Sequence, residues 1–387
     1  MMELPNRHAS NLELFLDLVF VFSVTQVTSY VALHLTLAGV AKGILLGFLV
    51  WWQWTGFTWA GTAVDFQSDR KARVLVLSMV PAMLVMAVSV PQSLDSQGWW
   101  FGSAYMVVQL FVLGLQALEA RKAKETLIPF LRYAPLAAIA PGVLFLSSFL
   151  RGDLRVAGFG LAAAGMIGSA VAATNRSGGE WTVDPTHFAE RHALFVIITL
   201  GEVLVAIGAT AAGVSSRSGL DAQTLFAIIV TAAVACVLWW AYFGFIPSVI
   251  ESMLDHAAPG ERGPVARDVG SFGHFPLVIG LILYAVVAKH LVDHPSGHLA
   301  PADRWLLLAG MVSFVGGQMA IQFRLRRVVV PERVVALGVV ALLALAAGVL
   351  PATVVIGLLA VALSVVATIT DRRFRGSELA RALSLDL

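Results

Sequence analysis

The sequence has few charged residues and a single cysteine, and each scarcity excludes a class of protein. Only 13% of the 387 residues are charged, whereas an ordinary soluble domain has about 25%. A soluble chain of this length needs polar groups to cover its surface, and the mean hydropathy of +0.82 shows that they are missing. The one cysteine, Cys236, excludes an internal disulfide and a cysteine-based metal or redox motif. The sequence therefore predicts an integral membrane protein.

The usual motifs for nucleotide binding and for catalytic zinc are also missing. The 26 Lys and Arg residues form no dense tract and leave a net charge of only +2, which predicts no nucleic-acid partner. Neither a G-x-x-x-x-G-K-[ST] loop nor an H-E-x-x-H pair occurs, and these motifs bind nucleotide phosphates and catalytic zinc. We therefore expect no ATP hydrolysis within this chain and no metal site. The sequence assigns no cofactor and no oligomeric state.

Apolar runs of about 20 residues, long enough to cross a bilayer as helices, recur along the whole chain. Charge clusters, Gly or Pro separate them, and they lack the short alternating pattern of barrel strands. The predicted fold class is therefore an all-α polytopic membrane protein. The twelve predicted spans are 12–37, 39–61, 74–92, 98–118, 127–150, 154–175, 187–213, 220–247, 272–292, 304–324, 330–349 and 351–370.

The distribution of Lys and Arg predicts the orientation of these spans. Segments on the side of the N-terminus carry 19 of the 26 basic residues, segments on the other side carry 5, and Arg132 and Lys289 fall within spans. Cytoplasmic loops are the ones enriched in Lys and Arg. We therefore expect a multi-pass protein of the cell (cytoplasmic) membrane, surrounded by the lipid bilayer, with both termini in the cytoplasm.

A repeated aromatic motif predicts two related halves. The pattern W-W-x-[WY]-x-G-F occurs at 51–57 and again 188 residues later at 239–245. Six spans in each half would make the halves parallel repeats. The first would cover 1–175, and the second would cover 187–387 with a short cytoplasmic C-terminal tail. The alternative is a chance match between Trp-rich belts at the membrane interface.

Several segments resemble the bacterial low-temperature-requirement A (LtrA) family. The resemblance is good over spans one to three and seven to nine and thins over the others. It implies a membrane location and supplies no substrate. The residues that carry it are Glu13-Leu-Phe-Leu-Asp17-Leu-Val-Phe-Val-Phe22, Trp51-Trp52 with Trp54 and Asp65, Glu190-Arg191, Leu200-Gly201-Glu202, Trp239-Trp240 with Tyr242, and His274-Phe275-Pro276-Leu277 with Gly280 and His290.

Ionisable groups inside spans are the first candidates for function, because each is costly to place in a bilayer. Glu13 and Asp17 lie four residues apart and share one face of the first span. Two adjacent carboxylates in a low-dielectric site hardly ionise together, so one of them would hold a proton near neutral pH. The alternatives are structural, since Ser10 and Glu13 have the spacing of a capping box and Asp17 is open to an ion pair.

The second span carries a polar stripe along one helical face. The stripe extends over about 21 Å and suits the lining of a hydrated path. Thr hydroxyls that bond carbonyls of their own helix at a packed interface are an equal alternative. The neighbouring Trp residues suit an interface belt and helix packing, or stabilisation of a cation. The stripe consists of Trp51, Thr55, Thr58, Thr62 and Asp65, and the aromatic cluster consists of Trp51, Trp52, Trp54 and Trp59.

Glu202 is the strongest single candidate for proton or cation coupling. It lies twelve residues beyond Glu190, about 18 Å along the helix and therefore near the bilayer midplane. Arg191 is too far along the same helix to neutralise it, and a buried structural acid is the alternative. His274 and His290 flank the ninth span, where an interfacial role is favoured over catalysis. The further candidates for a path or substrate site are Glu190, Arg191, Trp239, Tyr242 and His274.

Three functions fit these residues. The favoured one is a transporter or channel for a small solute or ion, with Asp17, Asp65 and Glu202 along the path, because two related bundles suit alternating access. The second is a membrane-embedded enzyme acting on a lipophilic, isoprenoid-like substrate, with an acid as proton donor or metal ligand and Trp rings shielding a carbocation. The third is a structural or sensory membrane protein.

Overall fold

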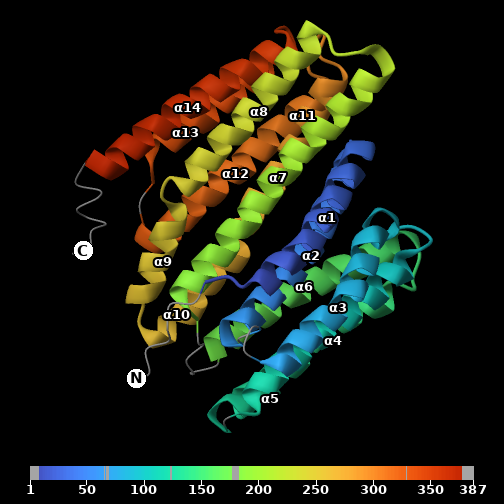
Figure 1. Cartoon of the computed structure of the whole chain (residues 1–387), viewed down its shortest axis with the longest axis vertical. Helices are drawn as coiled ribbons and strands as arrows, with labels where there is room; N and C mark the ends of the chain where they lie inside the picture. The colour runs from blue at the N-terminus through green and yellow to red at the C-terminus, as the bar shows by residue number, and fades with distance from the viewer. Residues whose placement is uncertain are drawn as a thin grey trace. The chain divides into compact units, whose positions relative to one another are not determined.

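The computed structural model describes residues 8–64, 66, 69–122, 124–176, 183–327 and 329–376, which are helices joined by short connections, with no strand among them. This confirms the predicted all-α class. The helices are α1 (Asn11–Leu33), α2 (Leu37–Ala63), α3 (Arg70–Ser89), η1 (Val90–Gln92), α4 (Gly98–Ala120), α5 (Lys124–Ser147), α6 (Gly152–Arg176), α7 (Pro185–Ser218), α8 (Ala222–Phe243), α9 (Ile246–His256), α10 (Pro259–Ala266), η2 (Arg267–Phe272), α11 (His274–Asp293), α12 (Pro301–Arg326), α13 (Pro331–Ala346) and α14 (Ala352–Gly376) (Figure 1).

Each of the twelve predicted spans coincides with one of these helices. Within the described residues, ten helices are long and apolar enough to cross a membrane. The other two spans correspond to α5, whose shorter apolar stretch is Tyr133–Ser147, and to α13, which has 16 residues. Helices α9 and α10 and the π-helical η2 were not expected between the eighth and ninth spans. The chain is thus a multi-pass membrane protein, with ten to twelve apolar helices among its described residues.

The helices form two compact units. Unit 1 contains Met1–Phe195 and Glu251–Phe275, and unit 2 contains Val196–Ile250 and Pro276–Leu387. The boundaries fall inside α7, α9 and α11, and the first eleven residues of α7 belong to unit 1. This division reflects contacts along the chain and does not test the predicted parallel repeats, which stay a prediction.

Small residues bring the helices of each unit together. In unit 1, α3 to α6 pack in sequence order, with α1 and α2 against them; a Cβ atom at Gly158 of α6 would lie 2.1 Å from the Ser147 hydroxyl. In unit 2, α14 packs on α8 and α13, and a Cβ atom at Gly280 of α11 would lie 2.6 Å from the Gly310 carbonyl oxygen of α12. Such close approaches are typical of helix packing in membranes.

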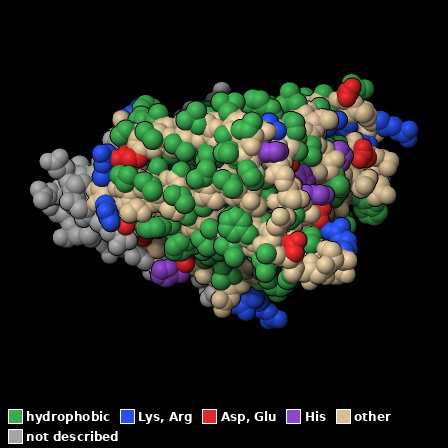
Figure 2. All heavy atoms as spheres, turned by 90° about the horizontal axis from the view of Figure 1, so that it is seen from above, with side chains coloured by type: hydrophobic (Ala, Val, Ile, Leu, Met, Phe, Trp, Pro, Cys, Tyr) green, Lys and Arg blue, Asp and Glu red, His purple; other side chains and the backbone are tan. Residues whose placement is uncertain are grey.

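Large apolar side chains lie on the surface of both units. Leu37 is 89% exposed, Leu345 75% and Val349 76%. Figure 2 shows hydrophobic side chains over much of the visible face, with few charged groups among them. Contiguous apolar surface of this kind is rare on soluble proteins, and it fits helices that face lipid.

Candidate functional site

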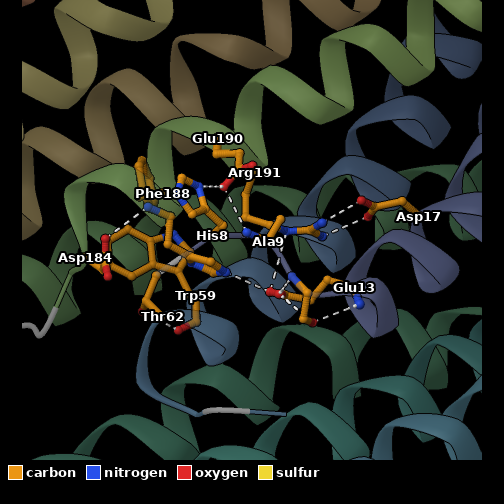
Figure 3. A network of polar contacts seen from close by, with 12 residues as sticks. His8, Ala9, Glu13, Asp17, Trp59, Thr62, Asp184, Phe188, Glu190 and Arg191 are labelled. Atoms are coloured by element: carbon orange, nitrogen blue, oxygen red, sulfur yellow. Dashed lines mark hydrogen bonds and ion pairs between the residues drawn. The ribbon is translucent and has the colours of Figure 1, made fainter. Parts of the chain in front are cut away.

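Two acids of α1 and two basic residues of α7 form a buried cluster in unit 1 (Figure 3). The Arg191 guanidinium donates two hydrogen bonds to Asp17, from Nη1 to Oδ2 at 2.5 Å and from Nη2 to Oδ1 at 2.8 Å. His187 Nε2 lies 2.9 Å from Glu13 Oε1. Both pairs are separated by 174 residues along the chain. Because the separation is the same, α1 and the start of α7 run parallel here, one pair on each of two successive helical turns.

The first turns of α1 and α7 hold the Glu13–His187 pair in place. Ser10 caps α1, with its N–H donating to Glu13 Oε2 at 2.8 Å and its hydroxyl accepting from the Glu13 N–H at 3.3 Å. The predicted capping box is therefore confirmed, and it occupies only one of the two Glu13 carboxylate oxygens. The other oxygen faces the imidazole of His187. The backbone N–H of His187 donates to Asp184 Oδ1 at 3.0 Å at the start of α7.

The Asp17–Arg191 pair lies against aromatic rings. Trp54 of α2 donates its indole N–H to Asp17 Oδ1 at 3.0 Å, and the guanidinium carbon of Arg191 lies 5.5 Å from the centre of a Trp54 ring. Trp51 stacks on Trp54 with ring centroids 4.9 Å apart. Side chains of Arg191 and Asp17 are 0% and 2% exposed, so the ion pair that was the alternative for Asp17 is present and shielded from solvent.

The formal charges of the cluster do not balance without an additional proton. Glu13 and Asp17 supply two negative charges and Arg191, which stays protonated in proteins, supplies one positive charge. Neutral His187 therefore leaves a net charge of −1, whereas one further proton, shared between His187 and Glu13, brings the cluster to zero. A buried net charge is costly, so the protonation state of this pair decides the electrostatics of the site. The second ring nitrogen of His187, Nδ1, is buried and has no hydrogen-bond partner among the described residues.

A glycine of α2 allows the cluster to close. A Cβ atom at Gly61 would lie 2.7 Å from Glu13 Oε1 and 3.5 Å from His187 Cε1. Any larger residue would therefore push into the carboxylate. Glu190 lies at the edge of the cluster, 35% exposed, where it accepts from the N–H of Ala9 at 2.8 Å and lies 3.2 Å from His8 Nδ1.

The π-helical turn η2 is tied to α2 by two tryptophans. Trp51 Nε1 donates to the Ser271 carbonyl at 2.8 Å, and Trp59 Nε1 donates to the Ser271 hydroxyl at 3.0 Å. His274 Nδ1 lies 2.7 Å from the Val269 carbonyl, and its ring centroid is 4.9 Å from that of His192. Single π-helical turns inside helices often occur at functional sites, and here side chains of α2 and α11 contact one.

A cavity of about 70 Å³ lies in unit 1 between α2, α4, α5, α6 and η2. That volume has room for several water molecules. The Arg267 guanidinium lines it and is held by Asp268, with Nη2 2.6 Å from Oδ1, and by the Thr174 hydroxyl. The cavity thus combines aromatic walls with a few polar groups, as small-molecule sites do. Its aromatic and polar lining consists of Trp52, Thr55, Trp59, Gln109, Tyr133, Ser169, Thr174, Arg267 and Ser271.

The structure brings together some of the predicted site residues. Of the Thr stripe, Thr55 lines the cavity and donates to its own helix at Trp52 O (2.8 Å), Thr62 donates to Trp59 O (2.8 Å), and the buried Thr58 hydroxyl has no partner among the described residues. Asp65 lies outside the described residues. In unit 2, Glu202 and Tyr242 are buried and Trp239 is 49% exposed. The residues gathered in unit 1 are Glu13, Asp17, Trp51, Trp54, Thr55, Glu190, Arg191 and His274.

Sequence reasoning missed His187 and Gly61 as members of the cluster. A signal for His187 was present, because His187 and Arg191 repeat the four-residue spacing of Glu13 and Asp17 with opposite charge. No signal marked Gly61, whose role depends on a close approach between distant helices. Ser271 and Arg267 were missed because they belong to η2, which the apolar pattern does not reveal.

Three histidines at 290, 294 and 298 are spaced four residues apart, a spacing that occurs in metal sites. In the structure they have separate neighbours: His290 Nδ1 lies 2.7 Å from Asp303 Oδ1, and His298 Nε2 lies 3.1 Å from the Val349 carbonyl. Across the described part of the chain, no three His, Cys, Asp or Glu side chains are grouped so that they could hold a metal ion.

Comparison with known proteins identifies the family. An uncharacterized protein of Rhizobium meliloti (strain 1021) is 26% identical over 325 residues, which are 80% of this chain and 76% of that protein. No solved structure matches the chain. The family model described as "Bacterial low temperature requirement A protein (LtrA)" matches residues 8–368, a range that includes the buried cluster, η2 and the cavity. The chain therefore belongs to the bacterial low temperature requirement A family.

Proposed function

We propose that the chain is a transporter for a small solute or ion, coupled to protons through the buried cluster of α1 and α7. The observation that carries this proposal is the charge of that cluster, in which two carboxylates face one guanidinium and one imidazole. Ionisable groups buried in a membrane protein commonly mark proton relays and substrate paths. A cluster that needs one proton for neutrality provides the proton-binding site that such a relay requires.

A continuous set of contacts links the cluster to the cavity. Asp17 accepts from Trp54, Trp54 stacks on Trp51, and Trp51 donates to the carbonyl of Ser271, which lines the cavity. A change in the hydrogen bonding of Asp17 therefore acts on the cavity wall through packed rings. We propose the cavity as the solute site, with the aromatic walls binding an apolar body and Thr55, Gln109 and Arg267 binding a polar group.

Flux through liposomes tests the proposal. Purified protein is reconstituted with a pH-sensitive dye inside, a pH gradient is imposed, and small organic acids, amines, sugars and monovalent cations are added one at a time. We expect at least one of these to dissipate the gradient, and we expect Glu13→Gln and Asp17→Asn to abolish the effect. The matched control is Glu119→Gln, since Glu119 is a half-buried acid of α4 that pairs with Lys122 outside the cluster. Equal flux in Glu13→Gln and Glu119→Gln would count against the cluster as the coupling site.

Two further acids belong in the same assay. Glu202 is 2% exposed within unit 2, and Asp65 follows α2 in the sequence. If Glu202→Gln abolishes flux while Glu13→Gln does not, the proton site lies in unit 2 instead of unit 1. If Glu202→Gln and Glu13→Gln both abolish flux, the path uses both Glu202 and Glu13, as expected for two related halves that alternate in access.

We also propose that the protein lies in the cell membrane with both termini in the cytoplasm. Arg155, Arg191, Arg267 and Arg333 are buried in the helical units. Without these four, the basic residues still divide 16 to 4 in favour of the side of the N-terminus, as cytoplasmic loops require. Fusions of a periplasmic and a cytoplasmic reporter to each connection test the orientation. Activity of the periplasmic reporter when fused after α14 would contradict it.

An enzyme acting on a lipophilic substrate is the second candidate, and the walls of the cavity favour it. Trp52, Trp59 and Tyr133 line one cavity, an arrangement suited to an apolar chain. Incubating membranes that contain the protein with isoprenoid alcohols and diphosphates, followed by mass spectrometry, tests this function. A new product that disappears in Asp17→Asn would favour the enzyme, and unchanged lipids together with solute flux would favour the transporter.

A further inference from the structure

Unit 2 contains a second small cavity, of about 30 Å³. Its lining includes two buried polar side chains that both present hydrogen-bond donors. Arg333 of α13 is 4% exposed and Gln318 of α12 is 2% exposed. Arg333 Nη1 and Gln318 Nε2 are both buried and have no hydrogen-bond partner among the described residues. Both atoms are donors. The cavity, which Thr370 and Asp371 also line, therefore offers buried N–H groups and the positive charge of Arg333 to an acceptor with negative charge.

Arg333 forms no ion pair with a carboxylate among the described residues. Its guanidinium carbon lies 5.2 Å from the ring centre of Phe245, and no described carboxylate is within ion-pair distance of it. A cation–π contact offsets only part of the cost of burying a cation, and arginine cannot lose its proton to escape that cost. Two acids are near: Asp371 lines the cavity, and Glu332 pairs with Arg373.

The place of Arg333 in the helix adds to the attraction for an anion. Arg333 is the third residue of α13, which begins at Pro331, and the first turn of a helix carries free N–H groups and partial positive charge. Most of the other lining residues come from α8, α12 and α14, and Arg324, Arg326, Arg372 and Arg373 lie near the C-terminal ends of α12 and α14. One wall is Trp240, which is 37% exposed, so the cavity borders the surface. Basic pockets between helices at this level bind anionic lipid headgroups.

We propose that Arg333 and Gln318 bind a phosphate group, most simply the phosphate of an anionic lipid headgroup, at a site independent of the proposed transport path in unit 1. A volume of about 30 Å³ holds about two water-sized groups. It therefore admits the charged oxygens of one phosphate, with the rest of the lipid outside between the helix ends. The guanidinium fork suits paired contacts to phosphate oxygens, and Gln318 supplies a further donor.

Thermal unfolding of the purified full-length chain tests the site. The midpoint is measured in uncharged detergent with added phosphatidylglycerol, with phosphatidylcholine, and with inorganic phosphate. A ligand that binds only the folded state raises the midpoint, so we expect phosphatidylglycerol to raise it and phosphatidylcholine to leave it unchanged. A saturable rise with inorganic phosphate alone would assign the same site to a soluble anion, whereas no rise with either phosphate source would overturn the proposal.

Substitutions decide whether Arg333 carries the effect. Arg333→Gln should reduce the affinity for phosphatidylglycerol by about tenfold or more, as expected for lost charge-assisted hydrogen bonds, and Arg333→Lys should keep part of it. Arg372→Gln is the matched control, because Arg372 is exposed at the same end of α14, and it should keep the full shift. Without lipid, Arg333→Gln should unfold at a temperature no lower than the unmodified protein, since it removes an unpaired buried charge. An unchanged lipid shift in Arg333→Gln, or a large loss of stability without lipid, would overturn the proposal.

Discussion

The buried pair of Asp17 and Arg191 should be worth far more to the folded protein than an exposed pair of the same residue types. Removing one partner of a buried ion pair costs about 3–5 kcal/mol when the other charge is left without a partner. We therefore expect Arg191→Met to destabilise the protein by about that amount, because Asp17 loses its ion pair, and Asp17→Leu to destabilise it less, because Arg191 keeps the 3.7 Å contact between its Nε and Glu13 Oε1. The double variant should lose much less than the sum of the two, because it leaves neither charge unpaired.

The chain contains a matched control for this double-mutant cycle. Arg217 donates to Asp293 at 2.6 Å, a distance like those in the cluster, but the side chains are 67% and 32% exposed. Exposed pairs contribute about 0–1 kcal/mol, so the cycle on Arg217 and Asp293 should give a coupling energy of that size. Both cycles are measured by denaturant unfolding in the same mixed micelles. Equal coupling energies for the two pairs would refute the argument that burial gives the Asp17–Arg191 pair its importance.

Three other substitutions test the packing around the sites, each with a control. Gly61→Ala places a methyl group 2.7 Å from Glu13 Oε1, so it should lower the free energy of unfolding by about 1–3 kcal/mol and abolish the proton-coupled flux. Its control is Gly208→Ala, where the space is open, and this variant should change the free energy of unfolding by less than about 1 kcal/mol. Trp51→Phe leaves the Ser271 carbonyl without its indole donor and should cost about 1–3 kcal/mol in the unfolding assay; the 39% exposed Trp99 is the control, and equal effects of Trp51→Phe and Trp99→Phe would contradict the role of that bond. Gly280→Ala places a methyl group against the Gly310 carbonyl of α12 and should destabilise unit 2, whereas Gly316→Ala meets no neighbour; equal unfolding midpoints would show that this helix crossing has room to relax.

The parts of the fold that depend on local sequence were predictable. Each apolar run corresponds to a helix because the need to satisfy backbone hydrogen bonds in lipid leaves a helix as the simplest solution for a single segment. The capping box at Ser10 and Glu13 was predictable for the same reason, since both residues lie within one turn.

The parts that depend on distant contacts were not predictable from one sequence. Asp17 was recognised as an unusual acid, but its partner comes from a helix 174 residues away. Trp51 and Trp54 suited an interface belt, yet both are at most 1% exposed, because hydrogen bonds to Ser271 and Asp17 draw their indoles inward. Composition marks the residues that are costly to bury, and only the packing of helices shows what compensates them.

The equal separation of the two pairs across α1 and α7 gives the cluster two possible registers. Arg191 Nε already lies 3.7 Å from Glu13 Oε1 while its terminal nitrogens bind Asp17. Sliding one helix past the other by a single turn, about 5.4 Å, would bring Arg191 fully onto Glu13 and place Phe195 beside Asp17. The guanidinium would stay on a carboxylate throughout such a step, whereas His187 would lose Glu13, and Asp17 would lose Arg191 and need a proton. The guanidinium of Arg191 would thus pair with Asp17 in one register and with Glu13 in the other. Its movement from Asp17 to Glu13 would be coupled to protonation of Asp17.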